Sequence, residues 1–129
     1  MSIDDSRPIW VQLVETFRIN IVSGAWPPSS KIPSVRELAL QAGVNPNTIQ
    51  RALGELDRQG LTEAERAQGR FVTADQHVID VTRAELALDA TRDHITTVTQ
   101  LGLSLDRAQE LLAEQWTDIE RTTREGDAQ

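Results

Sequence analysis

The chain has 129 residues, of which 39% are hydrophobic and 26% charged, a composition typical of a soluble globular protein. No apolar run reaches the roughly 18 residues that cross a bilayer, and no secretory signal is recognisable at the N-terminus. Because the chain contains no cysteine, disulfides and thiolate metal sites are excluded. We therefore expect a cytoplasmic protein without a membrane partner.

The charge is unevenly distributed along the chain. The net charge of −7 argues against a protein that coats nucleic acid nonspecifically. Residues 1–75 carry 8 Lys/Arg and 9 Asp/Glu, whereas residues 76–129 carry 5 and 11. The nearly neutral first part can still present a local basic face, so the charge neither supports nor excludes DNA binding.

The first predicted element is a helix that begins at Pro8, where a missing N–H group costs nothing. Its apolar residues recur at steps of three and four, and Gly24 is typical of a helix end. These apolar residues are Trp10, Leu13, Val14, Phe17 and Ile21. Residues 26–30 contain two prolines and predict a loop, and residues 31–32 could form a very short strand.

Two short helices joined by a tight turn are predicted next. Residues 34–37 form a capping box, which opens a helix that Gly43 ends. Asn45 and Pro46 suit the N-cap and the first position of a second helix, which Gly60 ends. This arrangement predicts a helix-turn-helix.

The rest of the chain predicts a hairpin and two further helices. Residues 61–65 and 69–73 could pair as a small wing, and a helix from about residue 80 would end at Gly102. Ser104 would cap a last helix that frays from about Glu125. The predicted fold is mainly α with a small β wing (α+β): a winged helix-turn-helix domain, residues 1–75, followed by a two-helix C-terminal dimerisation segment, residues 76–129.

The start of the second helix of a helix-turn-helix enters the major groove of DNA. Asn47 and Gln50 can each donate and accept a hydrogen bond in the pattern that suits adenine, and Arg51 suits guanine or phosphate. Thr48 and the N–H groups of the first turn suit a phosphate oxygen. These residue types at this position predict sequence-specific contacts with double-stranded DNA.

Three further arginines complete the candidate interface. Arg36, on the preceding helix, can reach the groove edge, and Arg66 and Arg70 at the wing suit the minor groove or a phosphate. Each has a plainer interpretation, because Arg36 could form a surface pair with Glu37 and the wing could be an ordinary hairpin turn. Their order within one helix-turn-helix and wing favours DNA binding.

The same region resembles the GntR family of bacterial transcription regulators. Residues 7–13 (RPIWVQL) are similar to its opening helix, residues 32–39 (IPSVRELA) to its most specific motif, and residues 43–48 (GVNPNT) to the start of its recognition helix. The resemblance extends over residues 7–73. The sequence of residues 45–48 (NPNT) and the short two-helix C-terminal segment resemble the YtrA-type branch in particular.

The resemblance implies a set of DNA contacts in this chain. They are Arg36, Asn45, Asn47, Thr48, Gln50, Arg51 and the wing around Gly69. The sequence departs from the family pattern at three places. Ser29 and Ser30 stand where the loop usually has a glycine, Ala67 replaces a wing glycine, and Arg70 replaces a small hydroxyl residue.

The two C-terminal helices predict an assembly. Their apolar stripes cannot both be buried within one chain, so an isologous homodimer is the economical arrangement. The resemblance likewise implies dimers on inverted repeats, and the alternative is a monomer whose tail folds back on the winged domain. Leu111, Leu112 and Trp116 could line a site for a small-molecule effector, although ordinary core is the alternative for these three.

No chemistry beyond binding is indicated. His77 and His94 are isolated and fall short of a metal site, and no catalytic constellation is present. We therefore expect a protein that is not an enzyme and needs no metal or cofactor. The predicted function is a homodimeric, sequence-specific transcription regulator, a repressor acting on an inverted-repeat operator. The alternative is a protein–protein interaction module on a winged helix scaffold.

Overall fold

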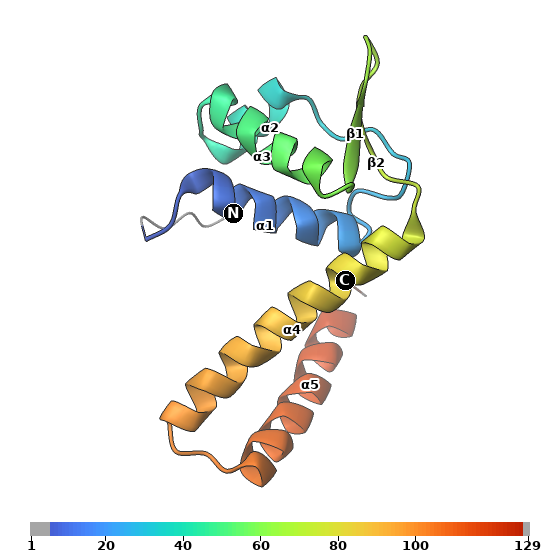
Figure 1. Ribbon diagram of the computed structural model, residues 1–129. Coiled ribbons are helices and arrows are strands. Elements are labelled where there is room, and N and C mark those ends of the chain that lie inside the picture. Colours follow the sequence, from blue (N-terminus) through green and yellow to red (C-terminus); the bar gives the residue numbers. More distant parts are fainter. Residues whose placement is uncertain (1–5, 128–129) are drawn as a thin grey trace. The chain divides into compact units, whose positions relative to one another are not determined.

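The computed structural model describes residues 6–127 and forms two compact units, the first ending at Ala87 and the second beginning at Leu88 (Figure 1). Three helices and a two-stranded hairpin are followed by two long helices, which confirms the predicted fold class. The elements in chain order are α1 (Ile9–Val22), α2 (Val35–Ala42), α3 (Pro46–Arg58), β1 (Thr62–Glu65), β2 (Gly69–Val72), α4 (Gln76–Gln100) and α5 (Leu105–Asp127).

The core of the first unit lies where α1, α2 and α3 meet the base of the hairpin. Its largest members, all fully buried, are Leu13, Ile21, Ile49, Leu53, Leu56, Leu61 and Ile79. Burial of each such side chain contributes about 1.5–3 kcal/mol of transfer free energy. The stripe predicted for α1 is buried at Leu13, Val14, Phe17 and Ile21. The helices are therefore fixed by the apolar periodicity that the sequence predicts.

Both helices of the helix-turn-helix begin with the predicted caps. The Ser34 hydroxyl accepts a hydrogen bond from the Glu37 amide at 3.1 Å, and the Glu37 carboxylate accepts one from the Ser34 amide at 3.4 Å. Gly43 ends α2 with a φ of +66°, in the left-handed region that favours glycine. The Asn45 carboxamide oxygen then caps α3 by accepting from the Asn47 amide at 2.8 Å. These local interactions set the angle of the turn.

The wing projects from the three helices (Figure 1). Strands β1 and β2 are antiparallel, with Thr62 opposite Val72 and Glu65 opposite Gly69. The very short strand expected at residues 31–32 is present as one bridge between Lys31 and Phe71. Strand β2 is thus paired with β1 along one edge and with Lys31 on the other.

Helix α4 begins at Gln76, four residues before the expected start. The Asp75 carboxylate accepts a hydrogen bond from the His77 amide at 3.0 Å, and the Thr73 hydroxyl accepts one from the Asp75 amide at 3.1 Å. These two short-range hydrogen bonds start the helix before the residue from which the apolar pattern predicts it. His77 consequently lies in the first turn of α4.

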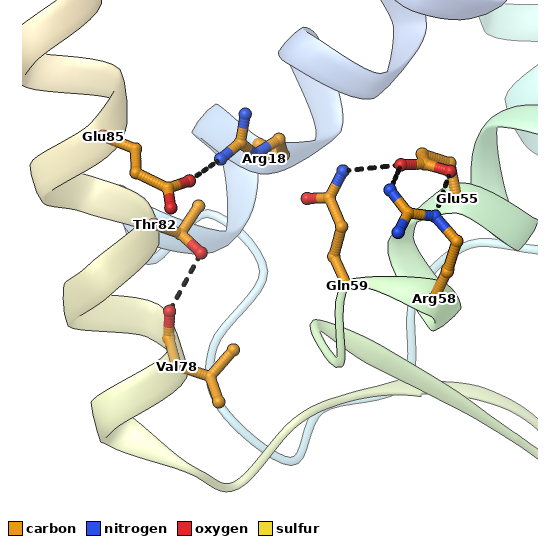
Figure 2. Close-up of polar contacts among 7 residues, drawn as sticks. All are labelled: Arg18, Glu55, Arg58, Gln59, Val78, Thr82 and Glu85. Atoms are coloured by element: carbon orange, nitrogen blue, oxygen red, sulfur yellow. Dashed lines mark hydrogen bonds and ion pairs between the residues drawn. The ribbon is translucent and has the colours of Figure 1, made fainter.

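The first turns of α4 pack on the other helices of the first unit (Figure 2). Ile79 and Thr82 are buried, and the Thr82 hydroxyl donates to the Val78 carbonyl at 2.9 Å. The Arg18 guanidinium of α1 donates to the Glu85 carboxylate of α4 at 2.7 Å. This part of α4 therefore belongs to the winged unit.

The second unit has no buried residue among residues 88–127. Its half-buried members are Val98, Leu103, Ala108 and Leu111. Ser104 caps α5 as predicted, because its hydroxyl accepts from the Arg107 amide at 3.2 Å. Helix α5 continues to Asp127, beyond the residue at which fraying was expected. In the described part of the chain no helix has the length and apolarity needed to cross a membrane.

Candidate nucleic-acid interface

One face of α3 is polar and open to solvent. Asn47, Gln50 and Arg51 are exposed and lie at steps of three and four residues, which places them on one side of the helix. The opposite side is buried through Ile49, Ala52, Leu53 and Leu56. The start of the helix is also accessible, since Asn45 is exposed and Thr48 is half-buried. The expected base-reading groups therefore point away from the core.

The cap interaction limits what Asn45 can offer to DNA. Its carboxamide oxygen already accepts the hydrogen bond from the Asn47 amide. The Asn45 NH2 group remains as the donor that can reach a phosphate oxygen. Asn45 thus combines helix capping with a donor at the helix N-terminus.

Arg51 stacks on an aromatic ring of α1. Its guanidinium carbon lies 4.3 Å from the centroid of the Trp10 ring. This cation–π contact restricts the arginine side chain, and a guanidinium stacked on a ring can still donate hydrogen bonds through its N–H groups. The sequence pattern predicts Trp10 only as part of the apolar stripe of α1, whereas the structure leaves it half-buried at the edge of the core and in contact with Arg51.

Lys31 crosses the wing at Gly69. Gly69 has a φ of +110°, and a Cβ atom built there would lie 2.7 Å from the Lys31 Cε atom. The positive φ favours glycine at this position, and the absence of a Cβ atom leaves room for the Lys31 side chain to pass close to the backbone. Lys31 was expected only as part of a short strand, and the structure adds it to the candidate interface.

A groove separates the wing from the recognition helix. It has a volume of about 480 Å³ and is bounded by the start of α2, the exposed face of α3 and both strands of the wing. Its polar lining residues are Lys31, Ser34, Gln50, Glu65, Gln68 and Arg70. The groove thus brings Gln50 of α3 together with Lys31 and Arg70.

The two wing arginines have different surroundings. Arg66 is exposed near the tip, whereas the Arg70 side chain is only 17% exposed. Arg70 donates two hydrogen bonds to the Asp57 carboxylate of α3, from Nε at 3.1 Å and from a terminal nitrogen at 3.0 Å. The Thr62 hydroxyl donates to the same carboxylate at 2.6 Å. Asp57 was not singled out from the sequence, because its partners lie up to thirteen positions away.

The cations of the winged unit fall into two groups. Arg7, Arg18, Arg58, Arg70 and Arg83 each form an ion pair. In contrast, four side chains form none with any residue of the range 6–127, namely Lys31, Arg36, Arg51 and Arg66. These four cations lie around α2, α3 and the wing, and their charges are not paired with a carboxylate of the described residues although the unit's total charge is small.

The three residues suggested for an effector do not share one pocket. Leu112 lines an apolar cavity of about 290 Å³ between α4 and α5, and Trp116 lines a separate hollow with Ile119. Leu111 is half-buried and belongs to the lining of neither. The residues described, 6–127, include no group of three His, Cys, Asp or Glu side chains that could hold a metal ion.

Comparison with known proteins agrees with this geometry. Residues 11–72 match the family described as bacterial regulatory proteins, gntR family. The HTH-type transcriptional regulator YhcF of Bacillus subtilis is 35% identical over 99 residues, which span 77% of this chain and 82% of YhcF. The HTH-type transcriptional repressor YtrA of the same organism is 29% identical, with 88% of each chain covered.

Solved structures are similar over the same region. A GntR family transcriptional regulator from Listeria monocytogenes has a TM-score of 0.79 and 33% identity, covering 87% of this chain and 98% of that one. The AraR DNA-binding domain in complex with operator ORX1 has a TM-score of 0.53 and 32% identity, covering 57% and 93%. The chain therefore belongs to the gntR family of bacterial regulatory proteins and is a DNA-binding transcriptional regulator rather than an enzyme.

Proposed function

We propose that this regulator is a repressor that binds an inverted-repeat operator as a homodimer. The observation that carries the DNA-binding surface is the set of cations without a carboxylate partner around the exposed face of α3. Unpaired cations keep their full charge for phosphates, because no salt bridge has to be broken first. The acidity of the rest of the chain then limits binding to this one surface.

The shape of the unit suggests how the duplex is held. In this proposal the N-terminal half of α3 enters the major groove, and Asn47 and Gln50 read base edges. The wing, with Arg66 and Gly69, approaches the neighbouring minor groove. One phosphate strand separates these two grooves of DNA, and it would run between α3 and the wing.

The groove between α3 and the wing has the chemistry for that strand. The Lys31 ammonium lies at the groove and would contact a phosphate, whereas Glu65 is the acidic residue of the lining. Arg36, Thr48 and Arg51 would hold phosphates on either side of the recognition helix. Asn45 lies at the start of α3 and Arg70 lies on the wing, so both belong to the proposed interface beside the residues that contact DNA.

The dimer is supported by the second unit. Large apolar side chains are exposed along α4 and α5, namely Leu88, Ile95, Leu101, Leu105, Leu112, Trp116 and Ile119. A helix pair with no buried residue has no core of its own to hold it together. A second copy of this chain is the partner that is always present, and its identical stripe would complete the core. Two recognition helices related by a twofold axis would read half-sites about one helical turn, or a multiple of it, apart.

Repression and effector control extend this proposal. The similar protein YtrA is a transcriptional repressor, which supports repression as the mode of action. The surface of the cavity between α4 and α5 is mainly apolar, and its polar lining residues are Thr91, His94, Thr99, Ser104 and Gln109. A small apolar molecule held there, against Leu112, would shift the population of dimers that fit the operator.

The test is selection of duplexes from a random pool, followed by binding measurements across a salt series. Arg36→Ala, Arg51→Ala and Lys31→Ala should each weaken binding, and each should lower the salt slope by about one. Arg92→Ala is the matched control, because Arg92 also lacks an ion pair among residues 6–127 but lies on α4 in the second unit. Equal losses in Arg92→Ala and in the winged-unit variants would contradict the proposed surface.

The protein–protein interaction module gives a different outcome. Such a module would enrich no sequence from the pool, and the three substitutions would leave any residual DNA binding unchanged. If the chain is only a weak polyanion binder, unselected DNA should compete for binding as effectively as any duplex recovered from the pool.

A further inference from the structure

One carboxylate of the recognition helix is hydrogen bonded to both strands of the wing. Asp57 of α3 accepts from Thr62 on β1 at 2.6 Å, and it accepts the two bonds from Arg70 on β2. A guanidinium that donates two parallel bonds fixes orientation as well as distance. We call Asp57, Thr62 and Arg70 the wing latch.

The wing latch differs from the other ion pairs of the winged unit. Its partners are 17% and 32% exposed, so solvent screens them less than most of the surface pairs. A second two-bond fork joins Arg58 to Glu55, but both residues lie on α3, three positions apart. That fork links no two elements, whereas the latch joins α3 to the hairpin.

Backbone bonds tie the same strand to the segment before α2. The Arg70 carbonyl accepts from the Ile32 amide at 3.0 Å, and the Val72 amide donates to the Ser30 carbonyl at 2.9 Å. These bonds fix the base of β2 along its length. The Arg70 side chain adds a hydrogen-bonded link from β2 to α3 that these backbone bonds do not provide.

We propose that Arg70 is a positioning residue and not a DNA contact: through Asp57 it holds the wing at a fixed angle to α3. Arg66 at the wing and the polar face of α3 then meet DNA as one body, without an ordering cost at binding. This inference rests on the proposed function, in which α3 and the wing contact one duplex together. It also explains the arginine at a position where the family usually has a small hydroxyl residue.

For the DNA affinity of Asp57→Ala, the wing latch predicts a change opposite to the one that charge alone predicts. Asp57→Ala removes a negative charge beside the DNA surface, so charge alone would strengthen binding to a polyanion. Loss of the latch instead weakens binding, because the wing is no longer held. Glu55→Ala is the matched control, since it also removes an arginine-bound carboxylate from α3 but leaves the wing attached.

The experiment uses the full chain and a duplex selected by the wild-type protein from a random pool. Asp57→Ala, Asp57→Asn, Arg70→Ala and Arg70→Lys should each weaken binding by about tenfold, and the Asp57→Ala/Arg70→Ala double variant should be no weaker than either single one. Arg70→Lys keeps the charge but loses the fork, so it should behave as Arg70→Ala. Glu55→Ala should bind at least as tightly as wild type.

A local readout separates the latch from general destabilisation. Hydroxyl-radical footprints of the latch variants should lose protection in the flanking minor groove and keep it where α3 docks. Thermal melting monitored by circular dichroism identifies any variant that unfolds at the assay temperature, and the mild Asp57→Asn and Arg70→Lys changes then decide the result.

Two outcomes overturn the latch alone, and a third overturns it together with the proposed function. If Arg70→Ala lowers affinity and the salt slope by about one while Asp57→Ala tightens binding, Arg70 contacts phosphate directly. If Asp57→Ala and Arg70→Lys bind as wild type does, the pair has no positioning role. A wild-type chain that selects no duplex would overturn the proposed DNA-binding surface together with the latch, and so is distinguishable from either result.

Discussion

The guanidinium of Arg51 lies over the indole ring of Trp10, 4.3 Å from its centroid, and joins the recognition helix α3 to α1. In the proposed function, this contact would hold Arg51 in place for a phosphate or a base before DNA binds. Trp10→Leu should therefore weaken binding to a selected duplex by roughly two- to fivefold, since such a contact is worth about 0.5–1 kcal/mol at an exposed site. Fluorescence anisotropy measures this change.

Trp10→Phe is the control for that prediction. Phenylalanine keeps an aromatic face and most of the packing against the core, so its affinity should stay close to that of wild type. If Trp10→Leu and Trp10→Phe lose the same affinity, or if Trp10→Leu loses none, the ring does not prepare Arg51.

The capping box of α2 predicts a stability effect of known size. Ser34→Ala removes the acceptor of the Glu37 amide and should destabilise the protein by about 1 kcal/mol, whereas Ser34→Gly should cost only a few tenths. For a domain of this size 1 kcal/mol corresponds to roughly 4–8 °C in Tm. Thermal melts of the two variants at pH 7 check the difference. Equal Tm values for Ser34→Ala and wild type would show that the cap contributes nothing to stability.

These examples show which features the sequence could predict. The ends of α2 and α3 were predictable because the signals at Ser34, Gly43 and Asn45 act within four residues. The start of α4 was not, because the apolar pattern obscured the cap formed by Asp75. The fold class followed from the apolar periodicity and from the glycine and proline residues at the ends of helices, which are also local signals.

The contacts within the candidate interface were harder to predict. Exposure of Asn47 and Gln50 followed from the α3 stripe, but the ring under Arg51 comes from another helix. Arg70 and Arg66 look alike in sequence, and only the position of Asp57 across the hairpin distinguishes them. Lys31 belongs to the candidate interface because its side chain passes close to Gly69 of the wing. No short-range sequence pattern encodes this contact.

The Glu55 carboxyl should titrate at an unusually low pH. Hydrogen bonds from Arg58 and then from Gln59 lower its pKa from 4.5 to about 2. Because the folded pKa lies below the unfolded value, the stabilisation is complete above about pH 4.3 and is lost as the pH falls toward 2. A carbon-13 NMR titration of the Glu55 carboxyl measures the pKa directly.

Two variants test the cause of the Glu55 shift. Arg58→Ala should raise the Glu55 pKa toward its ordinary value, because the strongest hydrogen-bond donor is gone and only Gln59 remains hydrogen bonded to the carboxylate. Glu55→Gln should make the free energy of unfolding less dependent on pH between 4.5 and 2. An unchanged Glu55 pKa in Arg58→Ala would contradict the assigned cause.

Gly54 separates stability from DNA binding. It lies within α3 on the same exposed side as Asn47 and Arg51, and a Cβ atom there would meet nothing within 4 Å. Gly54→Ala should therefore stabilise the protein by about 0.5–1 kcal/mol. Because the added methyl group would face the duplex, affinity should fall while Tm rises. Gly126→Ala on α5 is the control, and it should leave affinity unchanged; a Gly54→Ala variant with unchanged affinity would argue against docking through this face.

The apolar stripe of α5 predicts an obligate self-association. Trp116 and Ile119 are 63% and 64% exposed in the single chain, an unusual state for large apolar side chains. Sedimentation equilibrium should give a dimer for wild type, and Trp116→Glu should weaken dimerisation by more than tenfold, because it places an unpaired charge in an apolar interface.

The control for that substitution carries the same charge on the other side of the helix. Thr117→Glu places a carboxylate away from the stripe and should leave the dimer intact. Trp116→Glu should also weaken operator binding, because a monomer engages one half-site without the second, whereas Thr117→Glu should not. A monomeric wild type, or equal dissociation by both substitutions, would mean that the stripe is not the dimer seam. Operator binding would then depend on one winged unit alone.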